Sequence, residues 1–474
     1  ILSKLNFKKE ETEALLAAGW RMEKELAGID STLPESEQIR IMLSWDECVK
    51  AAGSFPLETI LRSWGFNEKE HFYMDTGYAK KLGRIYTDGN LEDLKSMLVM
   101  QLVTASALYL DRETYDLTKE LEKPRMFTMK EEPPRTEEYK NAGILFDEYI
   151  ANSSVGPILD ELYLRRYMKK KEARPLRRMV EDLKKHYEAL FQEEEWLSEE
   201  GRAQCIEKLS AMKTHVVYPD FDMVDYSSLK LIPRDKGGTF FKAVCDSQQC
   251  TAAHNAYLAG VVNDREKWDP YIISTTVTNA FYMPNTNGIY ILAGLLEDPI
   301  YRPDMSREEL LGGIGAVVGH EITHGFDANG SLYNKDGLKE SWMSSEDTTA
   351  FSDRTMKVSS YYSTIHPFSG AGSYDGSKVS AEATADMGGL RLTLAIAEDD
   401  PDFDYETFFR QYAAIWRTQN DEDVETSLIN ADEHPLAYLR INVGLQQFPK
   451  FYETFGVKEG DGMYLEESKR IAVW

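Results

Sequence analysis

Apolar residues recur every three or four positions through much of the first half of the chain, and this spacing predicts amphipathic helices. Residues 9–26 follow the pattern, and residues 91–110 form a longer and more apolar run. A third segment traces a single apolar stripe, formed by Leu176, Met179, Val180, Leu183, Tyr187, Leu190 and Phe191. The first half of the chain is therefore expected to be mainly helical.

This pattern is interrupted and then replaced. Residues 123–135 contain Pro124, Pro133 and Pro134, which predict a connecting segment. After Tyr218 the chain changes to short strand-like runs, glycine turns and short apolar helices. We place a domain boundary near residue 215, which gives domains 1–215 and 216–474 in a mainly α, α+β fold.

The most specific chemical signal lies around residue 320. Residues 306–309, Ser-Arg-Glu-Glu, form a capping-box pattern that marks the start of a helix. Residues 310–319 are apolar almost all round, so this helix is expected to be buried. It leads directly into residues 320–324, His-Glu-Ile-Thr-His.

Two histidines four residues apart lie on one face of a helix, where both rings can bind one metal ion. The chain has only 8 histidines, so a chance match to this pattern is uncommon. The arrangement is typical of zinc hydrolases, in which the metal binds a water molecule and a neighbouring carboxylate accepts its proton. A buried helix that ends in such polar groups also needs partners for them, and a metal supplies these.

The third protein ligand of such a site must come from elsewhere in the chain. Glu382 and Asp386 are four residues apart in a segment of small residues and are the best candidates. With 80 acidic residues in the chain, however, spacing alone favours a solvated acidic face. Asp327 has two readings of equal weight: a hydrogen-bond partner for the second ring nitrogen of His324, or a turn residue in the Asp-Ala-Asn-Gly segment 327–330.

Residues 320–324, followed by Glu-Ala-Thr-Ala-Asp at 382–386, resemble the neprilysin family of zinc endopeptidases. Further matching segments occur in the family's order: 278–282 (Thr-Asn-Ala-Phe-Tyr), 284–285, 293–295, 327–342, 432–434 (Asp-Glu-His), Arg440 and the final 471–474 (Ile-Ala-Val-Trp). Weaker similarity runs back through Tyr-Pro-Asp at 218–220 nearly to residue 1. The resemblance thus extends over most of the chain.

The resemblance implies one zinc ion per chain, with His320, His324 and Glu382 as its ligands. Glu321 would be the general base that activates the zinc-bound water, because zinc lowers the pKa of that water to about 7. The same carboxylate would then pass the proton to the leaving amine.

Further roles are implied for the residues around the metal. Asp386 and Asp327 would each hydrogen-bond one ligand histidine and fix its orientation. His434, held by Asp432, would stabilise the oxyanion of the tetrahedral intermediate. Arg440 would hydrogen-bond the substrate backbone just after the scissile bond.

The resemblance also implies how a peptide is held. Asn279 and Ala280 would bind it as an added strand, through the asparagine side chain and the alanine carbonyl. The side chain after the scissile bond would enter an apolar pocket, which suggests cleavage on the amino side of hydrophobic residues. The pocket residues would be Leu295, Ile300, Ala316, Val317, Ile415 and Trp416. Because Ala316 replaces the methionine of well-known relatives, we expect a roomier pocket.

In this family a helical lid domain faces a thermolysin-like zinc catalytic domain across an enclosed cavity, which admits oligopeptides. The implied function is therefore a zinc endopeptidase acting on oligopeptides. One alternative is a non-catalytic peptide-binding relative, against which the intact ligands, Glu321 and His434 argue. The other is a zinc aminopeptidase, but the sequence has no matching motif for holding a free amine.

Composition limits the partners. A net charge of −26 disfavours nucleic acid and anionic membranes, since both attract basic patches. No apolar stretch is long enough to span a membrane. None of the 4 cysteines has CxxC spacing, and a bridge between Cys245 and Cys250 stays open.

The extracellular animal members carry a cysteine near the C-terminus, where this chain has Ala472. This favours a bacterial-type member, secreted or on the cell surface, with a cytoplasmic location as the alternative. Family members also begin well before the region that residue 1 resembles. We therefore expect the chain either to associate with a separate N-terminal fragment of the same protein or to behave poorly alone.

Overall fold

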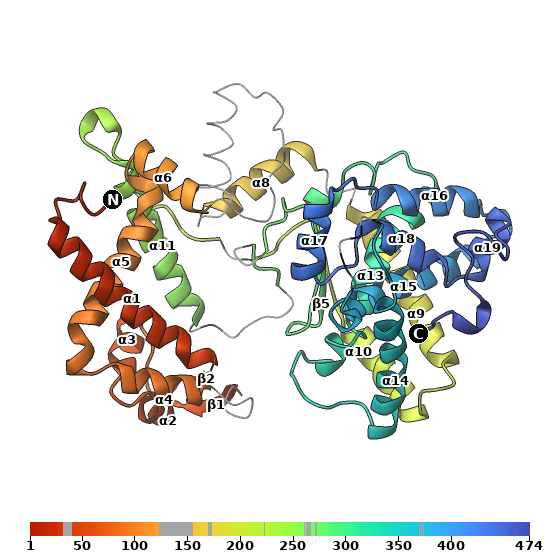
Figure 1. The fold of residues 1–474 in the computed structure, drawn as a ribbon, viewed down its shortest axis with the longest axis horizontal. Coiled ribbons are helices and arrows are strands. Elements are labelled where there is room, and N and C mark those ends of the chain that lie inside the picture. Colours follow the sequence, from red (N-terminus) through yellow and green to blue (C-terminus); the bar gives the residue numbers. More distant parts are fainter. Residues whose placement is uncertain are drawn as a thin grey trace. The chain divides into compact units, whose positions relative to one another are not determined.

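The computed structural model describes residues 1–31, 40–122, 155–168, 173–221, 223–259, 261, 267–270, 273–368, 370, 372 and 374–474. They form two compact units, which are described separately. One contains the described parts of 1–122 and 223–261, and the other those of 155–221 and 267–474. Helices dominate both units (Figure 1), which confirms the mainly α fold.

The first unit is a cluster of helices with one small sheet. Its helices are α1 (Lys9–Ser31), α2 (Trp45–Ala52), α3 (Leu57–Ser63), α4 (Thr76–Ile85), α5 (Leu91–Leu110), α6 (Arg112–Glu122) and α11 (Phe240–Ala259). Strands β1 (Arg40–Ser44) and β2 (His71–Asp75) pair antiparallel. α1 packs along α5 over a small core of Met22, Ile85, Leu94 and Met97. The helices predicted at 9–26 and 91–110 are both present.

The second unit contains the larger core and the HExxH segment. Its helices are α8 (Gly156–Tyr167), α9 (Ala173–Glu193), α10 (Glu199–Ala211), α12 (Arg307–Leu310), α13 (Ala316–His324), α14 (Ser345–Tyr362), α15 (Gly376–Glu398), α16 (Tyr405–Ile415), α17 (Glu422–Ala431), α18 (Ala437–Leu445) and α19 (Pro449–Phe455). Its sheet has the order β3-β5-β4, from Lys213–Val216, Gly288–Ile291 and Ala280–Met283. β3 runs parallel to β5, and β4 pairs antiparallel with β5, with Ala280 opposite Ile291.

The two units divide the chain differently from the boundary expected near residue 215. Five of the seven residues in the predicted stripe on α9 are buried and the other two are half-buried, but their partners lie in the second unit. Tyr187 and Phe191 pack against Phe326, with ring centroids 5.4 and 4.7 Å away. Conversely, α11 packs against α5 of the first unit. A change of sequence texture does not reveal such partners, because they lie more than a hundred residues away.

The expected capping box forms, but the helix behind it is not continuous. Ser306 accepts a hydrogen bond from the Glu309 amide, and α12 begins there. A π-helical turn, Leu311–Gly315, then separates α12 from α13, with Gly313 outside helical geometry (φ −92°, ψ −111°). A Cβ atom on Gly313 would lie 2.5 Å from the Ile300 carbonyl oxygen, so only glycine fits this turn.

Two further observations bear on the sequence predictions. Within the described part of the chain, no helix is both long and apolar enough to cross a membrane. All four cysteines, Cys48, Cys205, Cys245 and Cys250, are free thiols.

Candidate active site

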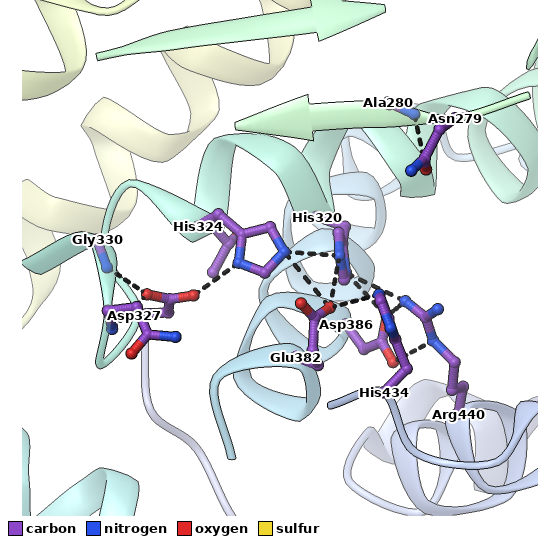
Figure 2. Close-up of polar contacts among 12 residues, drawn as sticks. Asn279, Ala280, His320, His324, Asp327, Gly330, Glu382, Asp386, His434 and Arg440 are labelled. Carbon is purple, nitrogen blue, oxygen red and sulfur yellow. Dashed lines mark hydrogen bonds and ion pairs between the residues drawn. The ribbon is translucent and has the colours of Figure 1, made fainter. Parts of the chain in front are cut away.

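Three candidate ligand atoms meet between α13 and α15 (Figure 2). His320 and His324 come from α13, and their Nε2 atoms are 2.9 Å apart. Glu382 comes from α15, and its Oε2 lies 3.3 Å from Nε2 of His320 and 3.5 Å from Nε2 of His324. The structure therefore brings together the three residues that the sequence nominated as ligands.

Glycines let the two helices approach closely enough for this. A Cβ atom on Gly319 would lie 2.9 Å from Cα of Gly389, and one on Gly389 would lie 2.6 Å from the Ala316 carbonyl oxygen. At the preceding position of α15, a Cβ atom on Gly388 would lie 2.3 Å from the Thr323 hydroxyl oxygen. Side chains at these positions would push α15, and with it Glu382, away from the histidines.

The residues present fit a zinc ion. Oε2 of Glu382 is buried and has no hydrogen bond of acceptable geometry, although three histidine nitrogens lie 3.2–3.5 Å from it. A metal cation among these atoms would satisfy the carboxylate. Burial alone would raise the pKa of Glu382, but the two histidines outweigh it and lower that pKa well below its usual range. Two imidazole nitrogens and one carboxylate oxygen are the donor set of several catalytic zinc sites.

Each histidine is oriented by a carboxylate on its other ring nitrogen. Nδ1 of His320 lies 2.9 Å from Asp386, and Nδ1 of His324 lies 2.6 Å from Asp327. The second oxygen of Asp327 accepts hydrogen bonds from the backbone N–H groups of Asn329 and Gly330, at 2.8 and 2.6 Å. Asp327 therefore has both of the predicted contacts: one oxygen holds His324, and the other stabilises the turn.

Glu321 lies on the same helix turn as the ligands but is not one of them. It is buried and lines the cavity beside His320 and His324. Burial raises the pKa of Glu321, although the neighbouring histidines oppose this effect. A carboxylate with a raised pKa, next to a metal-bound water, is suited to accept and release a proton.

His434 reaches the same point from the loop between α17 and α18 (Figure 2). Asp432 accepts hydrogen bonds from its Nδ1, at 2.8 Å, and from its backbone N–H, at 3.0 Å. These bonds leave Nε2 of His434 directed at the ligands, 3.2 Å from Oε2 of Glu382. This ring nitrogen can therefore donate to a group bound at the metal.

Arg440 has a partner that sequence reasoning missed. Its Nε and Nη2 donate to the two oxygens of Asp386, at 2.8 and 2.6 Å, and both residues are buried. Its guanidinium also lies over the Trp416 ring, 3.6 Å from the centroid. Burial opposes the charge of Asp386, but Arg440 and His320 outweigh it and lower the pKa of that carboxyl group. The two residues are 54 positions apart, so no local pattern could have indicated the pair.

β4 is the edge strand beside this site and carries the predicted peptide-binding residues. Asn279 precedes the strand, and its side-chain oxygen accepts the Ala280 N–H at 3.0 Å (Figure 2). This bond fixes the amide so that its NH₂ group remains to donate elsewhere. Among the strands that the structure describes, β4 pairs with β5 alone, so its other edge can accept an extended peptide.

A cavity of about 480 Å³ connects these groups. It is lined by the nominated residues Asn279, Ala280, Leu295, Ile300, Val317, His320, Glu321, His324, Asp327, Glu382, Ile415, Trp416, His434 and Arg440. Ala316 is not among the lining residues, because it is buried where α13 packs on Gly389. Sequence reasoning missed Phe281, Tyr282 and Asn329, which also line the cavity and stand within or beside segments that it nominated.

These features are those of a metallopeptidase. One helix carries two histidine ligands and a glutamate that is not a ligand, a second helix carries the third ligand, and an open edge strand lies beside them. Two family models, both described as peptidase family M13, match residues 1–219 and 279–471. The chain belongs to peptidase family M13, and this confirms the resemblance to the neprilysin family.

Individual relatives agree. The chain is 31% identical to a neutral endopeptidase of Lactococcus lactis over 325 residues, which are 69% of this chain and 50% of the relative. It is 25% identical to neprilysin-1 of Caenorhabditis elegans, over 84% of this chain and 54% of that protein. The crystal structure of PepO from Lactobacillus rhamnosis aligns with a TM-score of 0.81 and 26% identity, over 99% of this chain and 73% of that one.

The chain thus spans about half the length of the curated relatives it matches. These comparisons give no support for a separate N-terminal fragment as a partner.

Proposed function

We propose that this protein is a zinc-dependent endopeptidase that hydrolyses oligopeptides. The observation that carries the proposal is the convergence of His320, His324 and Glu382 on one point beside Glu321. Three of these residues can hold the metal and the fourth can act as the base, and the two histidines are oriented by Asp386 and Asp327.

The proposed mechanism assigns each step to residues of the chain. One zinc ion, held by His320, His324 and Glu382, would polarise the substrate carbonyl and lower the pKa of a bound water. Glu321 would accept a proton from the attacking water and deliver it to the leaving amine. Nε2 of His434 donates a hydrogen bond to the developing oxyanion.

Substrate selection is proposed to follow from the walls of the cavity. Leu295, Ile300, Val317, Ile415 and Trp416 supply apolar surface, which favours a hydrophobic side chain after the scissile bond. Cleavage would then fall on the amino side of hydrophobic residues.

We further propose that the mainly helical first part of the chain acts as a lid over a thermolysin-like catalytic part. The expected division at residue 215 needs adjusting in this proposal. α9 and α10 belong to the same compact unit as α13 and α15, and therefore to the catalytic part. A lid would restrict the substrates to short peptides.

An internally quenched oligopeptide, blocked at both ends, tests the proposal. The zinc-free chain should be inactive, and one equivalent of zinc should restore turnover, whereas Glu321→Gln should bind zinc without restored turnover. Blocked ends exclude an aminopeptidase, which needs a free amine. Peptide binding with no turnover at any zinc concentration would instead support a non-catalytic peptide-binding protein.

A further inference from the structure

Lys208, on α10, is a buried lysine that the proposed mechanism does not use. The residue is 1% exposed. Its Nζ donates hydrogen bonds to the carbonyl oxygens of Gly330 and Tyr333, at 2.8 and 2.6 Å. The rings of Phe326 and Trp342 flank it, with centroids 5.6 and 5.1 Å from Nζ. Such complete enclosure is unusual for lysine and calls for a specific role.

Both carbonyl partners belong to the loop that follows the second histidine. The N–H of Gly330 donates to Asp327, at 2.6 Å, and Asp327 in turn accepts from His324, also at 2.6 Å. Gly330 is therefore held at its carbonyl oxygen by Lys208, while its N–H donates to Asp327. Three hydrogen bonds, joined through the backbone of Gly330 and the carboxylate of Asp327, thus connect Lys208 to Nδ1 of His324.

Close packing and further hydrogen bonds also restrict the conformation of this loop. A Cβ atom on Gly330 would lie 1.8 Å from the carbonyl oxygen of His324, so the turn folds back tightly on the end of α13. Asn287 provides a second link between α10 and this loop. Its side-chain amide donates to the backbone carbonyl of Lys208 at 3.1 Å. That same amide group donates to the Lys335 carbonyl, also at 3.1 Å.

The arrangement works in either protonation state of the lysine. Burial lowers the pKa of Lys208 to about 7, although Asp327 opposes the shift. The neutral amine has two N–H donors and the ammonium has three, so both forms can satisfy the two carbonyl oxygens.

We infer that Lys208 is a positioning residue for the metal ligand His324, acting through Gly330 and Asp327. This inference rests on the proposed zinc site. Without the lysine, the two carbonyl groups lose their donor, the turn relaxes, and Asp327 no longer fixes the orientation of the imidazole. Outer-sphere partners of this kind typically change metal affinity by about 10–100-fold.

The test measures zinc affinity of the full chain by competition with a chromogenic chelator. Lys208→Met keeps the length and apolar stem but removes the donors, and we expect zinc to bind about 10–100-fold more weakly. Lys184→Met is the matched control. Lys184 is a half-buried lysine of the same unit whose Nζ donates to the Met212 carbonyl at 3.1 Å, and to neither Gly330 nor Tyr333, so its loss should leave zinc affinity unchanged.

A double-mutant cycle separates positioning from general stability. If Lys208 acts through Asp327, adding Lys208→Met to Asp327→Asn should weaken zinc binding little further. If the double variant lost zinc affinity by the product of the two single-variant factors, the inference would be overturned. Unchanged zinc affinity in a folded Lys208→Met protein would overturn it as well.

Lys208→Gln, which retains an N–H donor on a shorter side chain, takes the place of Lys208→Met in the same cycle if the methionine variant does not fold. Unfolding of both would assign Lys208 to the fold alone and overturn the positioning role. A wild-type chain that binds no zinc would refute the proposed function, whereas zinc binding that is indifferent to Lys208 would refute only this inference.

Discussion

Asp386 orients the metal ligand His320 and also neutralises the buried charge of Arg440. Replacing it by alanine should show how much each contact contributes. Its carboxylate accepts one hydrogen bond from His320 and two from Arg440, and all three residues are buried. Asp386→Ala leaves the guanidinium of Arg440 buried without its counter-charge. Breaking a buried ion pair by removing one partner costs about 3–5 kcal/mol.

That cost is a large fraction of the total stability of a domain, about 5–15 kcal/mol. The loss of orientation at His320 is smaller, since a 10–100-fold weaker zinc affinity corresponds to about 1.4–2.7 kcal/mol. We therefore expect Asp386→Ala to lower the stability of the zinc-free protein more than it lowers the free energy of zinc binding.

The test compares the single variant Asp386→Ala with a double variant that also carries Arg440→Met. Removing both charges leaves no uncompensated ion, so the double variant should regain much of the lost stability. Its zinc affinity should remain low, because His320 still lacks its partner. Denaturant unfolding of the chelator-treated proteins gives the first quantity, and chelator competition gives the second.

Two results would refute this reasoning. A zinc-free Asp386→Ala protein within about 1 kcal/mol of the wild type would show that the ion pair contributes little. A double variant no more stable than Asp386→Ala would show that the loss came from the cavity rather than from the unpaired charge of Arg440.

Three other substitutions test the remaining parts of the site. Glu321→Gln should retain zinc and lose about 10²–10⁴-fold in turnover, measured with the quenched peptide, and near-normal turnover would remove Glu321 from its role as the base. His434→Ala should lower kcat by about 10²–10³-fold, whereas a change confined to KM would make it a substrate-binding residue. Gly389→Ala should cost about 1–3 kcal/mol in unfolding experiments, because its Cβ would meet backbone atoms of α13 at 2.6 and 2.8 Å, and it should also weaken zinc binding by displacing Glu382. Unchanged zinc affinity in Gly389→Ala would show that α15 tolerates the shift.

Local periodicity predicted the parts of this protein whose cause is local. The apolar stripe of α9, the extent of α5 and the two histidines on one helix face all follow from the 3.6-residue repeat. The capping box at Ser306 was also predictable, but the π-helical turn behind it was not. That turn depends on the Ile300 carbonyl group, which packs against Gly313 from another segment.

Long-range pairs were beyond local reasoning. Glu382 was identified through family resemblance, since its spacing from Asp386 alone suggested a solvated face. The Arg440 ion pair joins residues 54 positions apart, and Lys208 reaches a carbonyl group 122 positions away. Both were invisible because an arginine or lysine in a sequence gives no sign of being buried.

In the proposed mode of binding, the open edge of β4 would also limit how long a peptide stays bound. The strand has four residues, and only alternate residues present their N–H and C=O groups to a neighbour on one side. At about 0.5–1.5 kcal/mol net for each hydrogen bond, backbone pairing contributes only a few kcal/mol. The Ala280 N–H already has an acceptor in Asn279, which makes this end of the edge a poor template for unrelated extended chains. If the proposed function holds, backbone pairing this weak would let the two halves of a cut peptide separate from the strand quickly.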